Sequence, residues 1–441
     1  MPLDPRSADG PSTTHTDGSF QSRVKVIRAA IIGTVVEYYD FGIYGYMATF
    51  VAMLFFVSED PTAALMGTFA AFAVAFFMRV PGGIFFGHIG DRYGRKQALS
   101  WTILLMVLAT ALIGLLPNYF TLGVWATILL VLCRCVQGFA AGGELGGANA
   151  FVAESAPARW RATQTSLVNS GTYLGSLFAA LVALAATSLF TEQQMLDWAW
   201  RIPFLLSLPI GVIGLYIRSH LDDTPQFKEL ADQGETKKVP VKTLLVTNWR
   251  SVLKIIGLGA VITGGYYIVS VYAATYLQTT AGHSSQLAFA STAVAMVVGA
   301  ATLPLSGYLA DTIGRKKVIL IGSVAAALLG FPMFMMMAAG PAWAAVVGQA
   351  VLFVCVSIVN GASFVTYAEM LSASTRYSGI ALGNNVTNTL LGGTAPFVAT
   401  WLISATGQSL APAGYFVLTA LITLVTVFFV AETRGTELRV D

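Results

Sequence analysis

The chain has 441 residues, of which 56% are hydrophobic and only 11% are charged. A soluble domain carries about 25% charged residues, so the composition argues against a soluble enzyme, a disordered chain or a nucleic-acid-binding protein. A formal net charge of +3 is also too small to indicate nucleic acid. At about 20 to 25 residues per membrane helix, roughly 300 embedded residues would form about twelve helices.

Twelve apolar runs follow a polar segment, residues 1–22, that we expect to be a disordered tail. In chain order the runs lie at about 27–55, 63–89, 98–117, 121–152, 163–190, 202–218, 252–278, 286–310, 317–339, 343–367, 378–404 and 412–431. Glycine and proline occur within several runs, and membrane helices tolerate both. The sequence therefore predicts an all-α polytopic membrane protein with twelve transmembrane helices.

Positive residues gather in alternate connections between these runs. The even-numbered links and both tails hold nearly all of them, and the odd-numbered links hold almost none apart from Arg201. By the positive-inside rule, the even links and both termini are predicted to be cytoplasmic. We expect a multi-pass protein of the inner (plasma) membrane.

The chain also repeats itself. Asp311 follows Asp91 by 220 residues in a similar glycine-rich link, and the pair Glu154 and Arg161 recurs 215 residues later as Glu369 and Arg376. Both offsets map six runs onto six runs in the same orientation, as in transporters that rock around a central site. The predicted organisation is a tail at 1–22, six-helix bundles at 23–218 and 252–433, a cytoplasmic linker at 219–251, and a tail at 434–441.

Five motifs in the sequence resemble those of a known family. They are Gly87-x-x-x-Asp91-Arg92-x-Gly94-Arg95-Lys96, Glu37-Tyr-Tyr-Asp40-Phe41, Arg79-Val-Pro81-Gly82-Gly83, Arg134-x-x-Gln137-Gly138 and Trp200-Arg201-Ile202-Pro203-Phe204. With the six-plus-six repeat, they resemble the major facilitator superfamily, and within it the metabolite:proton symporter branch, over about residues 24 to 434. The resemblance implies the major facilitator fold. It also implies a permease of osmolytes such as proline and betaine, or of acids such as 2-oxoglutarate, citrate and shikimate.

Ionisable residues at membrane depth mark functional sites. At about 1.5 Å of rise per residue, Asp40, Arg79 and Arg134 lie near the midplane. We hypothesise that Asp40 and Arg134 form a switchable pair that couples protons to transport, as the resemblance implies; the alternative is a static structural pair. Glu37 shares a helix face with Asp40, and either shares the proton or holds Arg79 or Arg134 in place.

Arg79 is the candidate partner for a substrate carboxylate, because guanidinium binds carboxylate in a two-pronged way. The alternative is a fixed bond to Glu37 or Glu144. The second half offers no Lys or Arg in mid-membrane, but it does offer Tyr266 and Tyr267, whose rings attract substituted ammonium groups. This combination favours a small zwitterion, although packing tyrosines are common.

Two further sets of residues complete the predicted site. The remaining substrate candidates are Tyr39, Tyr44, Gln137, Asn384 and Asn388. The asparagines would either bond the solute or hold helices together. The resemblance implies an inner gate formed by Asp91, Arg92, Arg95, Glu144, Glu154, Arg161, Asp311, Arg315, Glu369 and Arg376.

These features favour a secondary active transporter over an enzyme, since no zinc signature, phosphate-binding loop or nucleophile motif is present. We expect a proton-coupled symporter that imports proline or betaine by alternating access. The alternatives are a symporter of organic acids and, less favoured, a facilitative or export transporter. The expected partners are the solute, protons and the lipid bilayer. A monomer with no metal or cofactor, driven by the proton gradient, is expected. The chain ends soon after the last run, so no osmosensing role is predicted.

Overall fold

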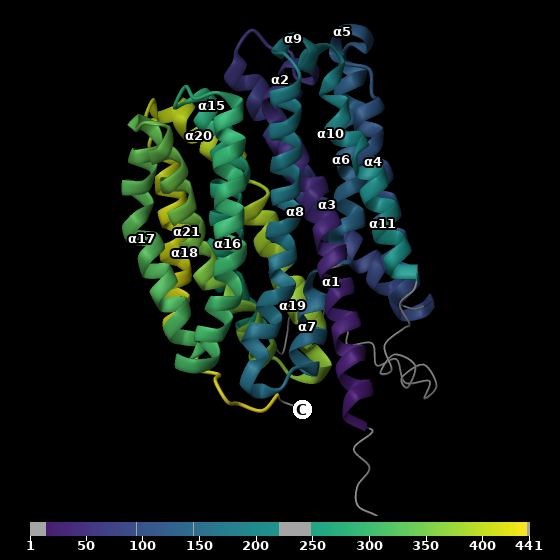
Figure 1. The fold of residues 1–441 in the computed structure, drawn as a ribbon, viewed down its shortest axis with the longest axis vertical. Coiled ribbons are helices and arrows are strands. Elements are labelled where there is room, and N and C mark those ends of the chain that lie inside the picture. The colour runs from purple at the N-terminus through teal and green to yellow at the C-terminus, as the bar shows by residue number, and fades with distance from the viewer. Residues whose placement is uncertain (1–14, 94, 144, 220–247, 439–441) are drawn as a thin grey trace, which may run out of the picture.

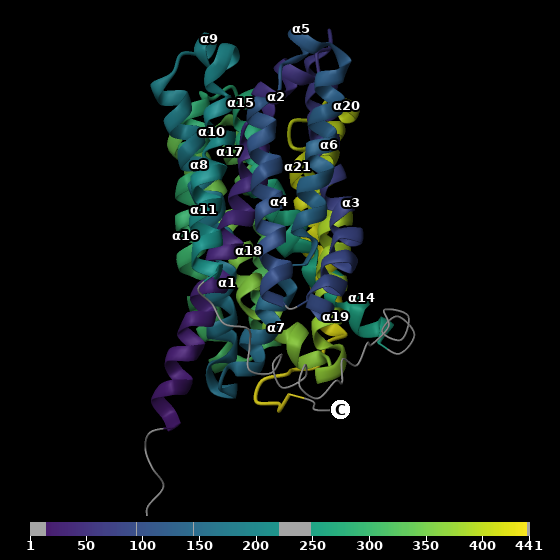
Figure 2. The ribbon, with the colours of Figure 1, turned by 90° about the vertical axis from the view of Figure 1, so that its right-hand side faces the viewer.

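The regular structure of this protein is helical throughout the part described by the computed structural model, residues 15–93, 95–143, 145–219 and 248–438. The helices run along the long axis of the molecule in two groups that stand side by side (Figure 1). Helices of the first half of the sequence form one group and those of the second half form the other. The described part of the chain begins and ends at the same end of the molecule, called the lower end below, as both views show (Figures 1 and 2).

Each predicted apolar run of the first half is helical, and several are divided. The helices are α1 (His15–Tyr46), α2 (Ala48–Phe55), α3 (Pro61–Tyr93), α4 (Arg95–Leu115), α5 (Tyr119–Leu122), α6 (Val124–Ala140), η1 (Ala141–Gly143), α7 (Leu145–Ser155), η2 (Ala158–Trp160), α8 (Arg161–Leu189), α9 (Glu192–Gln194), η3 (Met195–Ala199), α10 (Arg201–Leu205) and α11 (Ser207–Ser219).

The second half follows the same plan, with π-helical turns inside two of its helices. Its elements are α14 (Trp249–Ala260), η4 (Val261–Gly265), η5 (Ile268–Tyr272), α15 (Ala273–Thr279), α16 (Ser285–Ile313), α17 (Arg315–Ala339), α18 (Ala342–Met370), α19 (Ala373–Thr387), η6 (Asn388–Gly392), α20 (Ala395–Thr406) and α21 (Ala411–Phe428).

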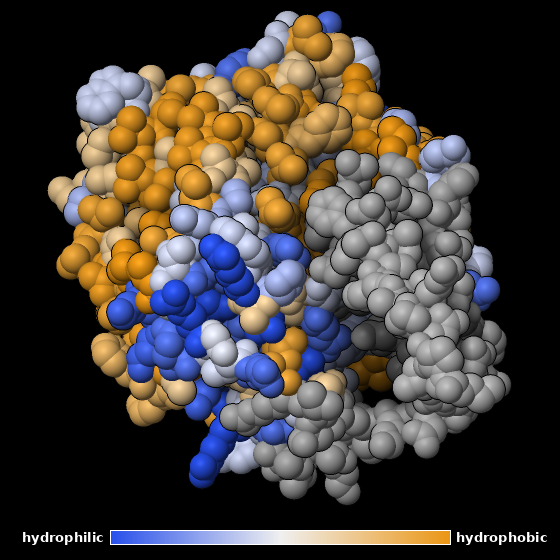
Figure 3. All heavy atoms as spheres, turned by 60° about the horizontal axis from the view of Figure 1, so that its bottom comes forward, coloured by the Kyte–Doolittle hydropathy of each residue, from blue (hydrophilic) through white to orange (hydrophobic). Residues whose placement is uncertain are grey.

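Seven of the described helices are long and apolar enough to cross a membrane, and the bent pair Glu192–Ala199 and Arg201–Tyr216 would make an eighth. The other predicted runs are shorter, are interrupted by turns, or, like α1, carry carboxylates and tyrosines. Large apolar side chains such as Leu132, Leu328 and Leu418 are more than half exposed on the sides of the molecule. Figure 3 shows hydrophilic side chains gathered at the lower end, with hydrophobic ones around them. This surface suits a protein surrounded by lipid.

Glycine permits close helix packing where the charged residues of the first half are held. A Cβ atom on Gly138 would lie 1.9 Å from the Ala75 carbonyl oxygen, and one on Gly142 would lie 2.2 Å from that of Arg79. Only glycine fits at such separations. These two glycines thus let α6 and η1 pack closely against α3, next to Arg79.

The two halves meet closely along α8 and α16. A Cβ atom on Gly307 would lie 2.4 Å from the Ser166 Oγ atom and 2.7 Å from the Ala162 carbonyl oxygen. The lower parts of these helices are therefore in direct contact in this conformation.

Candidate functional site

A small cavity lies between the two halves of the molecule. Its volume is about 20 Å³, which is about the room that one water molecule needs. Residues of α1 and α8 line it on one side, and residues of η4, α18, α19 and η6 on the other. They are Tyr38, Asn169, Thr172, Tyr173, Ile262, Thr263, Tyr266, Tyr267, Asn360, Phe364, Asn384 and Asn388.

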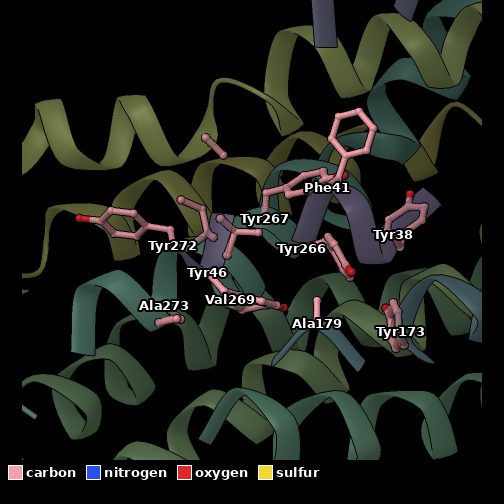
Figure 4. Close-up of a cluster of buried hydrophobic side chains, with 14 of the residues drawn as sticks. Tyr38, Phe41, Tyr46, Tyr173, Ala179, Tyr266, Tyr267, Val269, Tyr272 and Ala273 are labelled. Atoms are coloured by element: carbon pink, nitrogen blue, oxygen red, sulfur yellow. The ribbon is translucent and has the colours of Figure 1, made fainter. Parts of the chain in front are cut away.

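Tyrosine rings from both halves form an aromatic wall of the cavity (Figure 4). The Tyr266 ring stacks on that of Tyr173, with centroids 5.5 Å apart, and meets the rings of Tyr38 and Tyr267 edge-on at 6.1 and 5.1 Å. The Tyr266 hydroxyl lies 2.6 Å from the Ser176 Oγ atom, so a hydrogen bond joins the halves here. Such a wall offers aromatic faces to a cation.

Side-chain amides supply the polar part of the cavity wall. Asn388 donates to the Asn384 carbonyl oxygen at 2.9 Å. The Asn360 Oδ1 and Asn169 Nδ2 atoms are buried and have no hydrogen-bond partner in the described part of the chain. Because unpaired buried polar atoms are costly, these two are available to a solute. The lining residues named above include no Asp, Glu, Lys or Arg.

Three π-helical turns place the lining residues of the second half. The turns Val261–Gly265 and Ile268–Tyr272 flank Tyr266 and Tyr267, and the turn Asn388–Gly392 lies opposite. A Cβ atom on Gly392 would lie 3.0 Å from the Tyr267 ring. Single π-helical turns recur at functional sites because they redirect side chains within a helix.

Glu37 and Arg79 form a buried ion pair beside the cavity. The Arg79 Cζ atom also lies 5.0 Å from the centroid of the Phe41 ring and 5.3 Å from that of Phe76. Arg79 is not among the lining residues in this conformation. The geometry matches one of the alternatives considered for Glu37 and Arg79, a mutual bond, while the role of Arg79 as carboxylate partner stays a prediction.

Asp40 and Arg134 are both fully buried, but no ion pair joins them among the described residues. Neither Asp40 oxygen has a hydrogen-bond partner there. The Arg134 Cζ atom lies 4.1 Å from the centroid of the Tyr44 ring, and the rings of Phe41 and Phe72 are each 5.2 Å away. In this conformation the Arg134 guanidinium is thus held by aromatic faces rather than by the carboxylate.

Gln137 connects three helices around this arginine. Its Oε1 atom accepts from Arg134, and its Nε2 atom donates to the Thr110 hydroxyl at 2.7 Å and to the Asp40 carbonyl oxygen at 3.3 Å. It orients Arg134 and lies outside the cavity lining.

The predicted substrate residues are divided by the geometry. Tyr266, Tyr267, Asn384 and Asn388 line the cavity. Tyr39 and Tyr44 do not: their hydroxyls donate to the carbonyl oxygens of Pro203 and Thr68 at 2.6 and 3.1 Å.

Several lining residues of the first half were not predicted from the sequence as site residues, chiefly Tyr38, Asn169, Thr172 and Tyr173. The last three recur at helical spacing on α8, which was considered only as an apolar run. This polar and aromatic stripe was the available signal.

At the lower end, charged residues of the two repeats pair across the halves. Arg161 donates to Glu369 at 3.0 Å, and Arg376 donates to Glu154 at 2.7 Å. The repeated Glu and Arg residues thus exchange partners between halves. Asp311 accepts from the backbone N–H groups of Ala162 and Thr163, at 3.1 and 2.9 Å, and so caps α8 from the other half.

Arg315 and the C-terminal segment complete this network. Arg315 lies 3.2 Å from both Asp311 and Glu369. The Thr433 hydroxyl donates to Glu369 at 2.6 Å, and Arg161 donates to the Thr436 carbonyl oxygen at 3.3 Å. The lower end is closed by these bonds. The predicted gate residue Glu144 and the side chains of Asp91, Arg92 and Arg95 lie outside the part that the structure describes.

Comparisons with known proteins agree with this architecture. Residues 30–396 match the family model described as Major Facilitator Superfamily. A proline/betaine transporter of Salmonella typhimurium is 35% identical over 439 residues, covering 98% of this chain and 87% of the relative. The glycine betaine/proline/ectoine/pipecolic acid transporter OusA of Dickeya dadantii is 36% identical over 425 residues, covering 94% and 84%. The solved structure of the proton:xylose symporter XylE with 6-bromo-6-deoxy-D-glucose has a TM-score of 0.76 at 18% identity, covering 95% and 98%.

Proposed function

This chain belongs to the major facilitator superfamily, and we propose that it is a symporter that imports a small zwitterion, such as proline or betaine, together with protons. The family resemblance and the all-helical membrane fold predicted from the sequence are confirmed. The chain is therefore a multi-pass membrane transporter and not an enzyme. The solute, the coupling ion and the direction belong to our proposal.

The observation that carries the choice of solute is the composition of the cavity wall. It joins aromatic faces, which attract a substituted ammonium group, to amides, which bond a carboxylate without adding charge. A net-neutral zwitterion meets both needs. A dicarboxylate or tricarboxylate would bring uncompensated charge into a buried site, which is strongly unfavourable. The names of the relatives, which include proline and betaine, support the same choice.

The organic-acid alternative rests on Arg79. If Arg79 left Glu37 and turned into the cavity, it could bind a carboxylate in a two-pronged way. That exchange would leave the Glu37 carboxylate buried without its partner, at a cost of several kcal/mol. We therefore favour the zwitterion and keep Arg79 as the carboxylate partner only in the alternative.

We propose that Asp40 carries the coupled proton. A buried carboxylate without a partner is costly when ionised, so the conformation described above suits a protonated Asp40. The rings of Phe41, Tyr44 and Phe72 form an aromatic cage around the Arg134 guanidinium. If Arg134 leaves this cage and approaches Asp40, the ionised form of Asp40 is stabilised and Asp40 loses its proton. Glu37 holds Arg79 in this scheme. Proton and solute would then travel together when rocking of the halves moves Arg134.

The topology completes the proposal. Positive residues gather in the links of the lower end, which predicts that this end and both termini face the cytoplasm. The membrane would be the inner (plasma) membrane. The network around Arg161 and Glu369 would then be the cytoplasmic gate, closed in this conformation. Opening this gate while the opposite side closes is the alternating access that the two-bundle organisation, residues 23–218 and 252–433, allows.

Uptake by proteoliposomes with an alkaline interior tests the proposal. Labelled glycine betaine, proline, 2-oxoglutarate, citrate and shikimate are offered separately, with and without a protonophore. We expect betaine or proline to accumulate above the external concentration and the protonophore to abolish the accumulation. Accumulation of only the polycarboxylates would overturn the choice of solute. Equilibration that ignores the pH gradient would overturn proton coupling.

A further inference from the structure

Tyr267 lines the cavity and also contacts two rings of α3 that lie against the buried arginines. Its ring meets those of Phe72 and Phe76 edge-on, with centroids 5.7 and 5.1 Å away. The Phe72 ring lies 5.2 Å from the Arg134 Cζ atom, and the Phe76 ring lies 5.3 Å from that of Arg79. A continuous path of packed side chains thus leads from the solute cavity to both arginines (Figure 4 shows its start at Tyr267).

The Tyr267 side chain is held chiefly by packing, with the Tyr38 and Arg79 side chains near its hydroxyl. Its hydroxyl is buried and has no hydrogen-bond partner in the described part of the chain. Neighbouring tyrosines are fixed more firmly, since the Tyr266 hydroxyl bonds Ser176 at 2.6 Å and the Tyr173 hydroxyl accepts from Asn360 at 3.5 Å. A solute can therefore displace Tyr267 without breaking a hydrogen bond like those of Tyr266 and Tyr173.

A solute must displace part of the wall, because the cavity of about 20 Å³ has room for about one water molecule. Proline and betaine are several times larger. Close-packed interiors transmit such displacements, so pressure on Tyr267 passes to Phe72 and Phe76. Both rings would then be pressed more firmly against the guanidinium groups.

We propose that Tyr267 is a positioning residue that communicates occupation of the cavity to the proton site. The inference rests on the proposed function. A bound solute clamps Tyr267 onto Phe72, which keeps Arg134 in its aromatic cage and away from Asp40, so the proton stays. When the solute leaves, Tyr267 no longer holds Phe72 against Arg134, so Arg134 is able to approach Asp40 as the halves rock, and the Asp40 proton is then released to water. Solute and proton therefore stabilise one another, as symport requires.

Thermodynamic reciprocity makes this coupling measurable as binding. If solute favours the protonated protein, the affinity for solute must fall as pH rises. Allosteric couplings of this kind are typically about 5- to 150-fold. The proposal predicts that this pH dependence passes through the ring of Tyr267 rather than through its hydroxyl.

The experiment measures binding of labelled glycine betaine to the purified full chain in lipid nanodiscs at acidic and alkaline pH. We compare Tyr267→Phe, which keeps the ring, with Tyr267→Leu, which removes it. Tyr276→Leu is the matched control, because Tyr276 lies one turn beyond the π-helical segment, has an unpaired buried hydroxyl in the described structure, and does not line the cavity. We expect the wild type, Tyr267→Phe and Tyr276→Leu to bind about tenfold more weakly at alkaline pH. For Tyr267→Leu we expect a change of less than about twofold.

A Tyr267→Leu protein that binds more weakly at both pH values but keeps the wild-type ratio would overturn the inference, since Tyr267 would then only bind solute. Phe72→Leu leaves the cavity wall intact, so it is the second test variant if Tyr267→Leu fails to bind solute or to fold. It should also flatten the pH dependence, and a wild-type ratio in that variant would contradict the proposed path. Loss of pH dependence in the wild type itself would instead refute proton coupling, and the inference with it.

Discussion

At the scale of single residues, the scarce charges of the membrane region divide into two pairs with different surroundings. Glu37 and Arg79 form an ion pair, whereas the Asp40 carboxylate has no partner among the described residues and Arg134 lies among aromatic rings. We propose that the first pair is structural and that the second changes during transport, because neither Asp40 nor Arg134 is held by an opposite charge in this conformation.

Replacing Asp40 with Asn removes the proposed proton carrier and keeps the size of the side chain. We expect the Asp40→Asn protein to lose accumulation driven by a pH gradient and to keep exchange of labelled for unlabelled betaine across the membrane. Both are measured in the same proteoliposomes. Full pH-driven accumulation by this variant would contradict the role of Asp40, and Asn118→Ala, at a connection far from the cavity, serves as the control.

Asn384 is the amide whose loss should affect the solute most simply. In Asn384→Ala one hydrogen bond from an amide to the solute carboxylate is lost, worth about 1.5 to 3 kcal/mol because the acceptor is charged. We expect the KM for betaine to rise about 10- to 100-fold with little change in the maximal rate. An unchanged KM would indicate that Asn384 only holds helices together, the alternative considered from the sequence.

At the scale of helices, the sequence predicts the existence and order of the elements far better than their rotation. Continuous apolar stretches and alternating charge locate the twelve runs, and the repeat locates Glu154, Arg161, Glu369 and Arg376. Which side chains meet depends on how each helix turns about its axis. A helix that is apolar on all faces carries little periodic signal for that rotation.

The site residues that were predicted wrongly or not at all follow from this missing information on helix rotation. Tyr39 was expected at the site and Tyr38 was not, although they are neighbours, because a step of one residue turns a side chain about a quarter of the way round the helix. The π-helical turns beside Tyr266 and Asn388 shift the register again, and no residue pattern announced them. The partner of Arg79 was left open for the same reason.

The gate helices carry the next prediction. Glu369 accepts from Arg161 and Arg315 and from the Thr433 hydroxyl, so Glu369→Gln leaves buried guanidinium groups without their counter-charge. Removing one partner of a buried pair costs about 3 to 5 kcal/mol. We expect the closed lower end to lose population and betaine uptake to fall at least tenfold. Equal activity of Glu369→Gln and wild type would show that the network does not act as a gate.

At the scale of the whole molecule, two halves built on one repeat have diverged in chemistry. Of the buried charges beside the cavity, Glu37, Asp40, Arg79 and Arg134 all belong to the first half, whereas both halves contribute tyrosines and amides to the cavity wall. Their contact along α8 and α16 permits only small side chains, as at Gly307. We infer that a change at Arg134, in the first half, depends on the ring of Tyr267, in the second.

A large side chain at Gly307 should hold the halves apart at the lower end. In Gly307→Leu the new atoms would occupy the space of Ser166 and Ala162. A cysteine at the cavity residue Thr172, in a background without the three native cysteines, reports access. An impermeant thiol reagent is added from the lower side. We expect it to modify the cysteine at position 172 faster in the Gly307→Leu protein than in the same protein with Gly307. An unchanged rate would show that α8 and α16 do not close that side.

The central claim is that the solute and a proton enter together. It is tested most directly by the internal pH of proteoliposomes that hold a pH-sensitive dye and receive an inward gradient of glycine betaine or proline, with no imposed pH difference. We expect the interior to become acidic when glycine betaine or proline enters. Citrate and 2-oxoglutarate should cause no acidification, and neither should the zwitterion with the Asp40→Asn protein. Entry of labelled betaine without any change in internal pH would contradict it.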